Sequence, residues 1–194
     1  QNFNGAVPQV TYNVSDGSLS ASSTLDITVT GINDAPVAVN DAGNVTDEDT
    51  AITIATITSN DTDDDTVDAS TIILIDPNNQ LNTGNSTTPL VIPNIGTYTV
   101  DTSGNVTFTP VANYNGLANV DYTVKDNDGV VSNLATVAIS VTAVNDAPVA
   151  VADTNATNED TLLTVNAANG LLANDSDVEG TPLSVTSFVI NGTI

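Results

Sequence analysis

Carboxylate side chains recur in this sequence as pairs separated by a single residue, a spacing that suits a bound cation. The pairs fall in three similar stretches: Asp61 with Asp63, Asp126 with Asp128, and Asp175 with Asp177. Two carboxylates offered by one turning segment can bind a single ion in a shell made of oxygen atoms. A lone pair of this kind is usually a solvated turn, so the prediction of a metal site depends on what recurs beside it.

The overall charge also favours a bound cation. Against 24 acidic residues the chain has one basic residue, Lys125, and its formal net charge is -23. Such a surface repels nucleic acid and anionic membranes, and no apolar run reaches the roughly 18 residues of a membrane span. The chain has no Cys, His or Arg, which excludes disulfides, thiolate or imidazole metal sites and nucleophilic triads. Calcium suits the remaining oxygen donors better than magnesium, which demands a tighter octahedron.

The sequence repeats itself around the segment "NDAP", which occurs at residues 33–36 and 145–148. "NFNG" near the N-terminus matches a later "NYNG", and "NVTDEDT" matches a later "NATNEDT". Repetition of this kind indicates a tandem array. It predicts the C-terminal part of one repeat at residues 1–35, a complete repeat at 36–147, and the N-terminal part of another at 148–194.

Short β-type runs alternate with turn clusters, which predicts an all-β fold of tandem Ig- or cadherin-like Greek-key β-sandwiches. Tyr98 and Val100 are expected to oppose Phe108 and Val106 across a hairpin. Tyr122 is expected in the core, either as an ordinary aromatic or as a tyrosine corner. The expected strands A to G of the complete repeat are 36–40, 50–57, 70–75, 96–100, 105–110, 120–124 and 135–143. The first segment then supplies only F and G, and the last segment only A to C.

Sandwich geometry predicts where the acidic loops lie. The B–C and F–G loops share the pole at which the chain begins the repeat, which we call the N-terminal pole. The candidate ligands there are Asn33, Asp34, Asp61, Asp63, Asp126 and Asp128. At the opposite, C-terminal pole the candidate ligands are Glu48, Asp49, Asn145 and Asp146, together with Asp175 and Asp177 of the following repeat. Carboxylates gathered without a basic partner repel one another unless a cation intervenes.

These residues resemble the cadherin-like tandem repeats of large bacterial surface proteins, over the entire chain. The linker of cadherins, similar to "D-x-N-D-N-A-P", binds calcium together with a D-x-D loop of the following domain and an acid of the preceding one. The resemblance assigns Asn33 and Asp34, and likewise Asn145 and Asp146, to that linker. It assigns Asp61 with Asp63, and Asp175 with Asp177, to the D-x-D loop, and Glu48 to the preceding acid. Gly31 and Ala143 replace an acid of the family pattern, so one or two ions per junction are expected.

The resemblance implies a non-enzymatic, calcium-stiffened repeat of an extracellular adhesin or surface filament, acting as an extender in cell adhesion or biofilm. The implied partners are neighbouring repeats or identical subunits, and a host or cell-surface receptor is a further candidate. Isolated strands leave the backbone hydrogen-bonding groups at their edges unpaired, so the incomplete ends are expected to pair with further polypeptide. Either the sequence is an excerpt from a longer array, or the incomplete ends of different molecules complement one another. The excerpt is favoured because the two ends together lack a D–E hairpin.

Two other classes of function fit the sequence less well. A carbohydrate-binding module usually presents exposed aromatic residues, whereas aromatics make up 4% of this chain and most have core positions. An enzyme could use paired carboxylates as a glycosidase does. No aromatic platform accompanies the pairs, and metal ligation or solvated turns explain them better.

Overall fold

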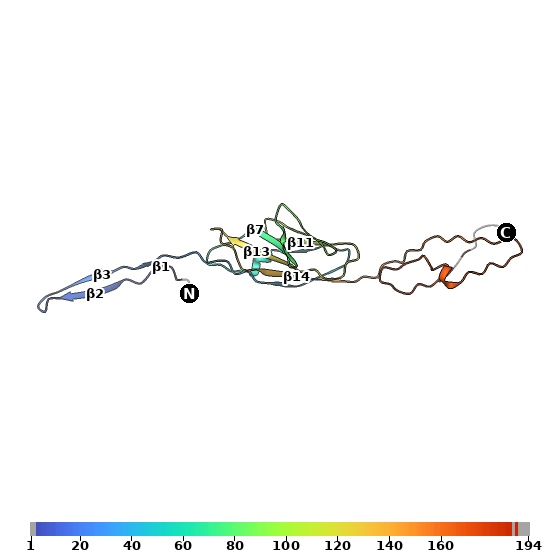
Figure 1. Cartoon of the computed structure of the whole chain (residues 1–194). Coiled ribbons are helices and arrows are strands. Elements are labelled where there is room, and N and C mark those ends of the chain that lie inside the picture. Colours follow the sequence, from blue (N-terminus) through green and yellow to red (C-terminus); the bar gives the residue numbers. More distant parts are fainter. Residues whose placement is uncertain (1–2, 188, 190–194) are drawn as a thin grey trace. The chain divides into compact units, whose positions relative to one another are not determined.

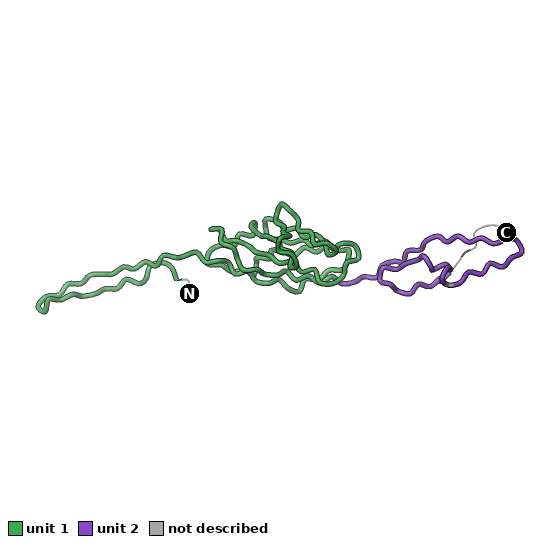
Figure 2. Tube along the Cα trace, in the orientation of Figure 1, with its two compact units in different colours: residues 1–141 green, residues 142–194 purple. Residues whose placement is uncertain are grey.

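The computed structural model describes residues 3–187 and residue 189. The chain divides into two compact units, residues 1–141 and residues 142–194, shown in separate colours in Figure 2. The first unit contains a β-sandwich and, N-terminal to it, a β-hairpin. The expectation of an all-β fold is confirmed. In the part of the chain that is described, no helix is long and apolar enough to cross a membrane.

Two sheets form the sandwich (Figure 1). The first contains, in spatial order, β6 (Ile52–Ile54), β11 (Val106–Pro110), β10 (Gly96–Val100) and β9 (Leu90–Ile92). The second contains β12 (Gly116–Leu117), β14 (Ala135–Thr142), β13 (Val120–Asp126), β7 (Val67–Asp76) and β8 (Asn79–Gly84). The strand β5 (Asp41–Asp47) also pairs with β14, so the first and last long strands of the repeat are neighbours.

Alternating apolar residues from both sheets fill the core. In the β10–β11 hairpin, Tyr98 pairs with Phe108 and Val100 with Val106, as the sequence predicts. The rings of Tyr98 and Phe108 are 4.7 Å apart between centroids and both side chains are fully buried. Gly96 begins β10 at a place where a Cβ atom would lie 2.5 Å from Phe108 Cε2. The absence of a side chain there lets the backbone pack directly against the ring.

Two expected strands differ from those observed, and two observed strands were not expected. Residues 36–40 form only an isolated bridge, between Val37 and Thr62, and the regular strand is the later β5. The backbone of Ala38 is bonded to the Asn133 side chain instead of to a neighbouring strand. The Ala38 N–H donates to Asn133 Oδ1 at 2.9 Å, and the Asn133 amide donates to the Ala38 carbonyl oxygen at 2.8 Å. Expected strand B is shortened to β6 and followed by the 3-10 helix η1 (Ile57–Asn60), which buries Ile57. Strands β8 and β9 occupy a stretch that was expected to be a C–D connection.

The hairpin before the sandwich consists of β2 (Val10–Ser15) and β3 (Ser20–Leu25), preceded by the short pair β1 (Gly5–Ala6) and β4 (Thr28–Val29). Its register agrees in part with that of β13 and β14. Tyr12 pairs with Ser23 as Tyr122 pairs with Ala135, and the two pairs on the side away from the turn also correspond. Nearer the turn Ser15 pairs with Ser20, whereas Lys125 forms a bridge with Val131, one residue out of that register. The hairpin thus shares part of the pairing pattern of β13 and β14, and its side chains are exposed.

The second unit holds the bridge Val149–Ser176 and the 3-10 helix η2 (Ala167–Asn169). Apart from this bridge, the described residues from 143 onward form no hydrogen-bonded strand, although strands A to C were expected there. In the described part of this unit only the Val149–Ser176 bridge links two segments, and a strand needs a continuous ladder with a neighbouring strand. Its AB turn nevertheless repeats that of the sandwich, since Asp49 and Asp160 both have φ of 58°.

Candidate metal centre

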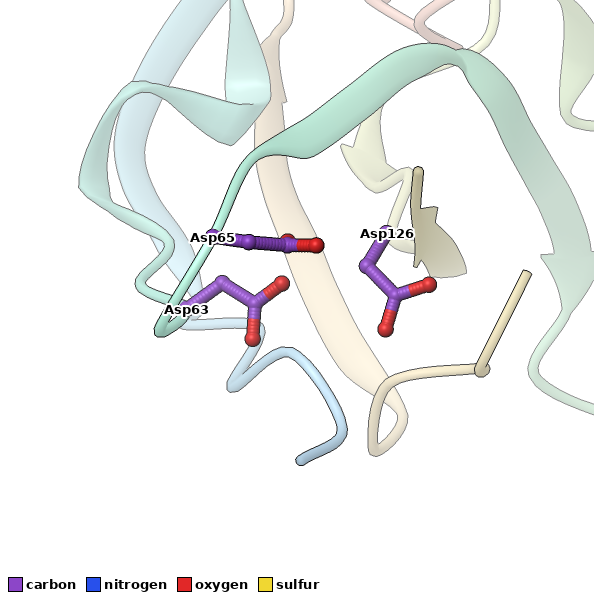
Figure 3. Close-up of side chains that lie close together, drawn as sticks. All are labelled: Asp63, Asp65 and Asp126. Carbon is purple, nitrogen blue, oxygen red and sulfur yellow. The ribbon is translucent and has the colours of Figure 1, made fainter. Parts of the chain in front are cut away.

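Three carboxylates converge at the N-terminal pole of the sandwich. Asp63 and Asp65 lie in the loop between β6 and β7, and Asp126 ends β13. One carboxylate oxygen from each of the three lies within 4.8 Å of the other two. Figure 3 shows the three side chains facing a common space. Two loops distant in the sequence thus bring together the hard oxygen donors of one potential cation site.

Asp63 is the residue of this cluster whose charge is least satisfied. Both of its carboxylate oxygens are buried and have no hydrogen-bond donor. Burial, together with the neighbouring Asp65 and Asp64 carboxylates, raises the pKa of Asp63 to about 6. A buried carboxylate without a donor is costly unless a positive charge lies beside it. The geometry therefore suits a cation at Asp63.

Asp126 is held in its charged form by hydrogen bonds. Its Oδ1 accepts the Val130 N–H at 2.8 Å, and its Oδ2 accepts the Asn33 side-chain amide at 2.7 Å. Burial opposes ionisation, but the bonds from Asn33 and from the turn backbone outweigh it and lower the pKa of Asp126. Asn33 thereby ties the linker to the β13–β14 loop. These bonds stabilise the ionised Asp126 carboxylate, which makes it a suitable anchor for a metal ion.

Asp34, the next linker residue, faces the same loop. It lines a surface cavity together with Asp63 and Asp64. The linker backbone is fixed just beyond it, because Val37 and Thr62 exchange hydrogen bonds of 2.8 and 3.1 Å and Pro36 is buried. Asn33 and Asp34, predicted as linker ligands, are thus brought to the pole that carries Asp63 and Asp126.

Two other predicted ligands of this pole are not part of the cluster. Asp61 is turned away from the cluster: its carboxylate accepts the Val39 N–H at 2.7 Å and the Tyr122 hydroxyl at 3.0 Å. Asp128 is exposed and is not among the clustered carboxylates. The pair that converges is therefore Asp63 with Asp65, two residues later than the pair singled out from the sequence. Asp65 was missed, although "DTDDD" contains a second pair with the same spacing.

At the C-terminal pole the predicted ligands Glu48 and Asp49 are engaged within the sandwich. Glu48 is buried and accepts the Asn115 side-chain amide at 3.3 Å. The Asp49 carboxylate accepts the Asn113 N–H at 3.0 Å. These bonds fasten the β5–β6 turn to the β11–β12 loop. Both residues therefore have a structural role in the fold of this pole.

The remaining candidates belong to the second unit. The Asp175 carboxylate accepts the Val151 N–H at 2.8 Å, and Asp177 accepts the Thr181 N–H at 3.0 Å. Asn145 donates its side-chain amide to the Asp146 carbonyl oxygen. Asp146 has one carboxylate oxygen buried without a donor, and its N–H lies 3.3 Å from a Glu179 carboxylate oxygen. Glu179, which was not among the predicted ligands, thus lies next to the linker residue Asp146.

The fold and the site define a β-sandwich repeat with an acidic pole where the linker meets two loops. Residues 33–143 match the family model of the bacterial cadherin-like domain, and residues 144–194 match that of the cadherin-like domain. The chain belongs to the bacterial cadherin-like family. No curated protein matches the sequence. Domains of this family are structural, adhesion-type repeats, typically non-enzymatic, usually extracellular and generally able to bind calcium.

Proposed function

We propose that this chain is a calcium-stiffened structural repeat of an extracellular bacterial adhesin or surface filament. The observation that carries the proposal is the Asp63 carboxylate, buried without a donor beside Asp65 and Asp126. Calcium accepts irregular shells of carboxylate, amide and carbonyl oxygens, which is the donor set at this pole. Asp63, Asp65 and Asp126 would hold the ion, with Asn33 and Asp34 beside it.

Stiffening follows from where the ligands originate. The ion would connect the linker to the β6–β7 and β13–β14 loops, and it would offset the repulsion among their carboxylates. Without it, the linker is held to Asp126 through the Asn33 amide and to the β6–β7 loop through the Val37–Thr62 bridge. In a tandem array, coupling of each repeat to its neighbour converts a flexible string into a rod. An extender in cell adhesion or biofilm needs that property.

Calorimetric titration of the whole chain with calcium tests the binding. We expect dissociation constants of roughly 10⁻⁴ to 10⁻³ M, as in other extracellular modules. The double variant Asp63→Asn with Asp65→Asn should lose at least one bound ion. Asp128→Asn, which removes a charge from the same pole outside the cluster, is the matched control and should bind like the unmodified chain. Equal binding by the double variant and the control would contradict the site.

Small-angle scattering tests the stiffening separately. The maximum dimension of the chain is measured in millimolar calcium and again with a chelator. We expect a longer and more narrowly distributed particle with calcium, because the linker residues 33–36 would be held by the ion. An unchanged distance distribution, in a sample that binds calcium by calorimetry, would leave a calcium-binding protein without the proposed stiffening role.

A further inference from the structure

Asn33 bonds the linker directly to the candidate metal centre. Its side-chain Nδ2 donates to Asp126 Oδ2 at 2.7 Å, across 93 residues of sequence. A short bond from an amide to a carboxylate is charge-assisted and is stronger than a bond between neutral groups. Asn33 is half-buried and Asp126 is buried, so water competes little for this bond. The linker is therefore fixed to one of the three clustered carboxylates.

The carboxylate of Asp126 is held from two sides. Val130 N–H donates to Oδ1 at 2.8 Å, while Asn33 donates to Oδ2. In this orientation one carboxylate oxygen lies within 4.8 Å of an oxygen of Asp63 and an oxygen of Asp65 (Figure 3). Without the Asn33 bond the carboxylate would be held from the turn backbone alone and could turn more readily about its Cβ–Cγ bond. Hydrogen bonds that orient a carboxylate in this way are typical of the outer shell of metal sites.

The chemistry of the two groups determines which end of the Asn33 amide faces Asp126. An ionised carboxylate only accepts hydrogen bonds, so it attracts the amide nitrogen and repels the amide oxygen. Rotation of the amide by half a turn would place two acceptor oxygens against each other with no proton between them. Asn33 therefore acts on the cluster as a donor. The resemblance to cadherins assigns it instead to the calcium ligands, which bind through oxygen.

The linker also holds the loop that carries the other two carboxylates. Val37 and Thr62 exchange backbone hydrogen bonds of 2.8 and 3.1 Å, and Thr62 directly precedes Asp63. The segment 33–37 thus bonds at one end to Asp126 and at the other end to the β6–β7 loop. The spacing between the two halves of the carboxylate cluster therefore depends on the linker being in place.

We propose that Asn33 is a positioning residue of the cation site: through its Nδ2 donor it orients the Asp126 carboxylate towards the other two clustered carboxylates, and it is not itself a ligand. This rests on the proposed function, because it assigns a role at the same site. The Asn33 bond and the bound ion reinforce one another, since each favours the same orientation of Asp126. Cation affinity is therefore coupled to the attachment of the linker to the sandwich.

A double-mutant cycle tests whether Asn33 acts through Asp126. The whole chain is titrated calorimetrically with terbium, a trivalent ion that binds calcium-type oxygen ligands more tightly and keeps the weaker variants measurable. We expect Asn33→Ala to weaken binding about tenfold, as loss of outer-shell partners does at other metal sites. In the Asp126→Asn background the same substitution should change the affinity by less than about twofold, because the carboxylate that Asn33 positions is gone. Similar weakening in both backgrounds would mean that Asn33 binds the ion directly and would overturn the proposal.

Controls separate this role from the proposed function. Asn127→Ala removes an exposed asparagine next to Asp126 and should bind like the unmodified chain. If Asn33→Ala also binds like the unmodified chain, the positioning role is overturned and the proposed function stands. If neither terbium nor calcium binding depends on Asp63 and Asp65, both are overturned.

NMR spectroscopy tests the orientation of the amide in the loaded protein. Scalar coupling across the hydrogen bond, from Asn33 Nδ2 to the Asp126 carboxyl carbon, should be observed in the whole chain both without calcium and with it. The coupling reports the bond itself, which a general effect of a substitution on stability would not. Loss of the coupling when calcium saturates the site would show that the amide rotates to offer its oxygen, and it would overturn the proposal.

Discussion

The hydroxyl of Tyr122 lies 3.0 Å from Asp61 Oδ1 and 3.0 Å from the Val39 carbonyl oxygen. A core aromatic of one sheet thus fixes an acidic loop residue and the first segment of the repeat at a single point. This contact explains why Asp61 is drawn inward while Asp63 and Asp65 remain directed at the pole. It also differs from the tyrosine corner, in which the hydroxyl bonds to a backbone group only a few residues upstream.

Replacing Tyr122 by Phe should destabilise the sandwich by about 1 to 3 kcal/mol, since it removes a buried hydroxyl bonded to a carboxylate. Urea unfolding of the variant and the unmodified chain measures the difference. Tyr12→Phe, at the equivalent exposed position of the hairpin, is the control and should change stability little. An unchanged midpoint for Tyr122→Phe would show that the contact contributes nothing to stability.

Asp41 predicts a dependence of stability on pH. Burial, followed by the charge of Asp61, raises its pKa to about 6, and one of its carboxylate oxygens is buried without a donor. Because the folded state favours the neutral form, stability should increase as pH falls from about 6 towards the ordinary carboxyl pKa near 4. Asp41→Asn should raise stability at pH 7 by about 1 kcal/mol, after allowance for solvent screening.

Thermal unfolding at pH 7 and pH 5 without metal checks this expectation. The difference between the two pH values should be smaller in Asp41→Asn than in Asp128→Asn, which removes an exposed charge. If Asp41→Asn proves less stable than the unmodified chain at pH 7, the ionised carboxylate is stabilising and the explanation fails.

Gly96 predicts a steric effect in the core. A methyl group there would lie 2.5 Å from the Phe108 ring and closer still to the Thr109 carbonyl oxygen. Gly96→Ala should therefore cost about 1 to 3 kcal/mol through overpacking and displacement of β11. Urea unfolding is the measurement, and Thr99→Ala on the exposed face of the same strand is the control. Equal midpoints for the two variants would contradict the close approach.

Protons should compete with calcium at Asp63. With a pKa of about 6, its carboxyl is about nine-tenths protonated at pH 5, so calcium should bind about tenfold more weakly there than at pH 7. Calorimetric titrations at the two pH values measure the ratio. The Asp63→Asn variant should show a much smaller ratio, and a similar ratio in both proteins would assign the proton to another group.

The sequence alone predicted the parts of the fold that depend on alternation and repetition. The pairing of Tyr98 with Phe108 follows from two apolar faces joined by a Ser-Gly-Asn turn. The presence of Asp63, Asp126 and Asn33 at one pole follows from the order of strands in a sandwich. Membership of a bacterial cadherin-like family was also recognisable from the repeated linker, and the family match confirms it.

The identity of the clustered carboxylates could not be predicted in the same way. "NDTDDD" contains four acids, and the pairs Asp61 with Asp63 and Asp63 with Asp65 have the same spacing. The sequence therefore does not distinguish the two pairs. In the structure the Tyr122 hydroxyl, 61 positions away, bonds to Asp61 and keeps it out of the cluster. The same holds for residues 36–40, where side-chain bonds from Asn133 replace the expected ladder.

The pairing of β5 with β14 has a mechanical consequence. β5 follows the linker that begins the repeat, and β14 leads into the linker that ends it. A pulling force applied through the two linkers is therefore transferred between these neighbouring strands. The Asn44 side-chain amide in β5 donates to the Ala138 carbonyl oxygen of β14 at 3.0 Å. Asn40, directly before β5, accepts the Thr136 N–H at 2.8 Å. The hydrogen bonds between β5 and β14 therefore lie directly between the two linkers through which the force acts.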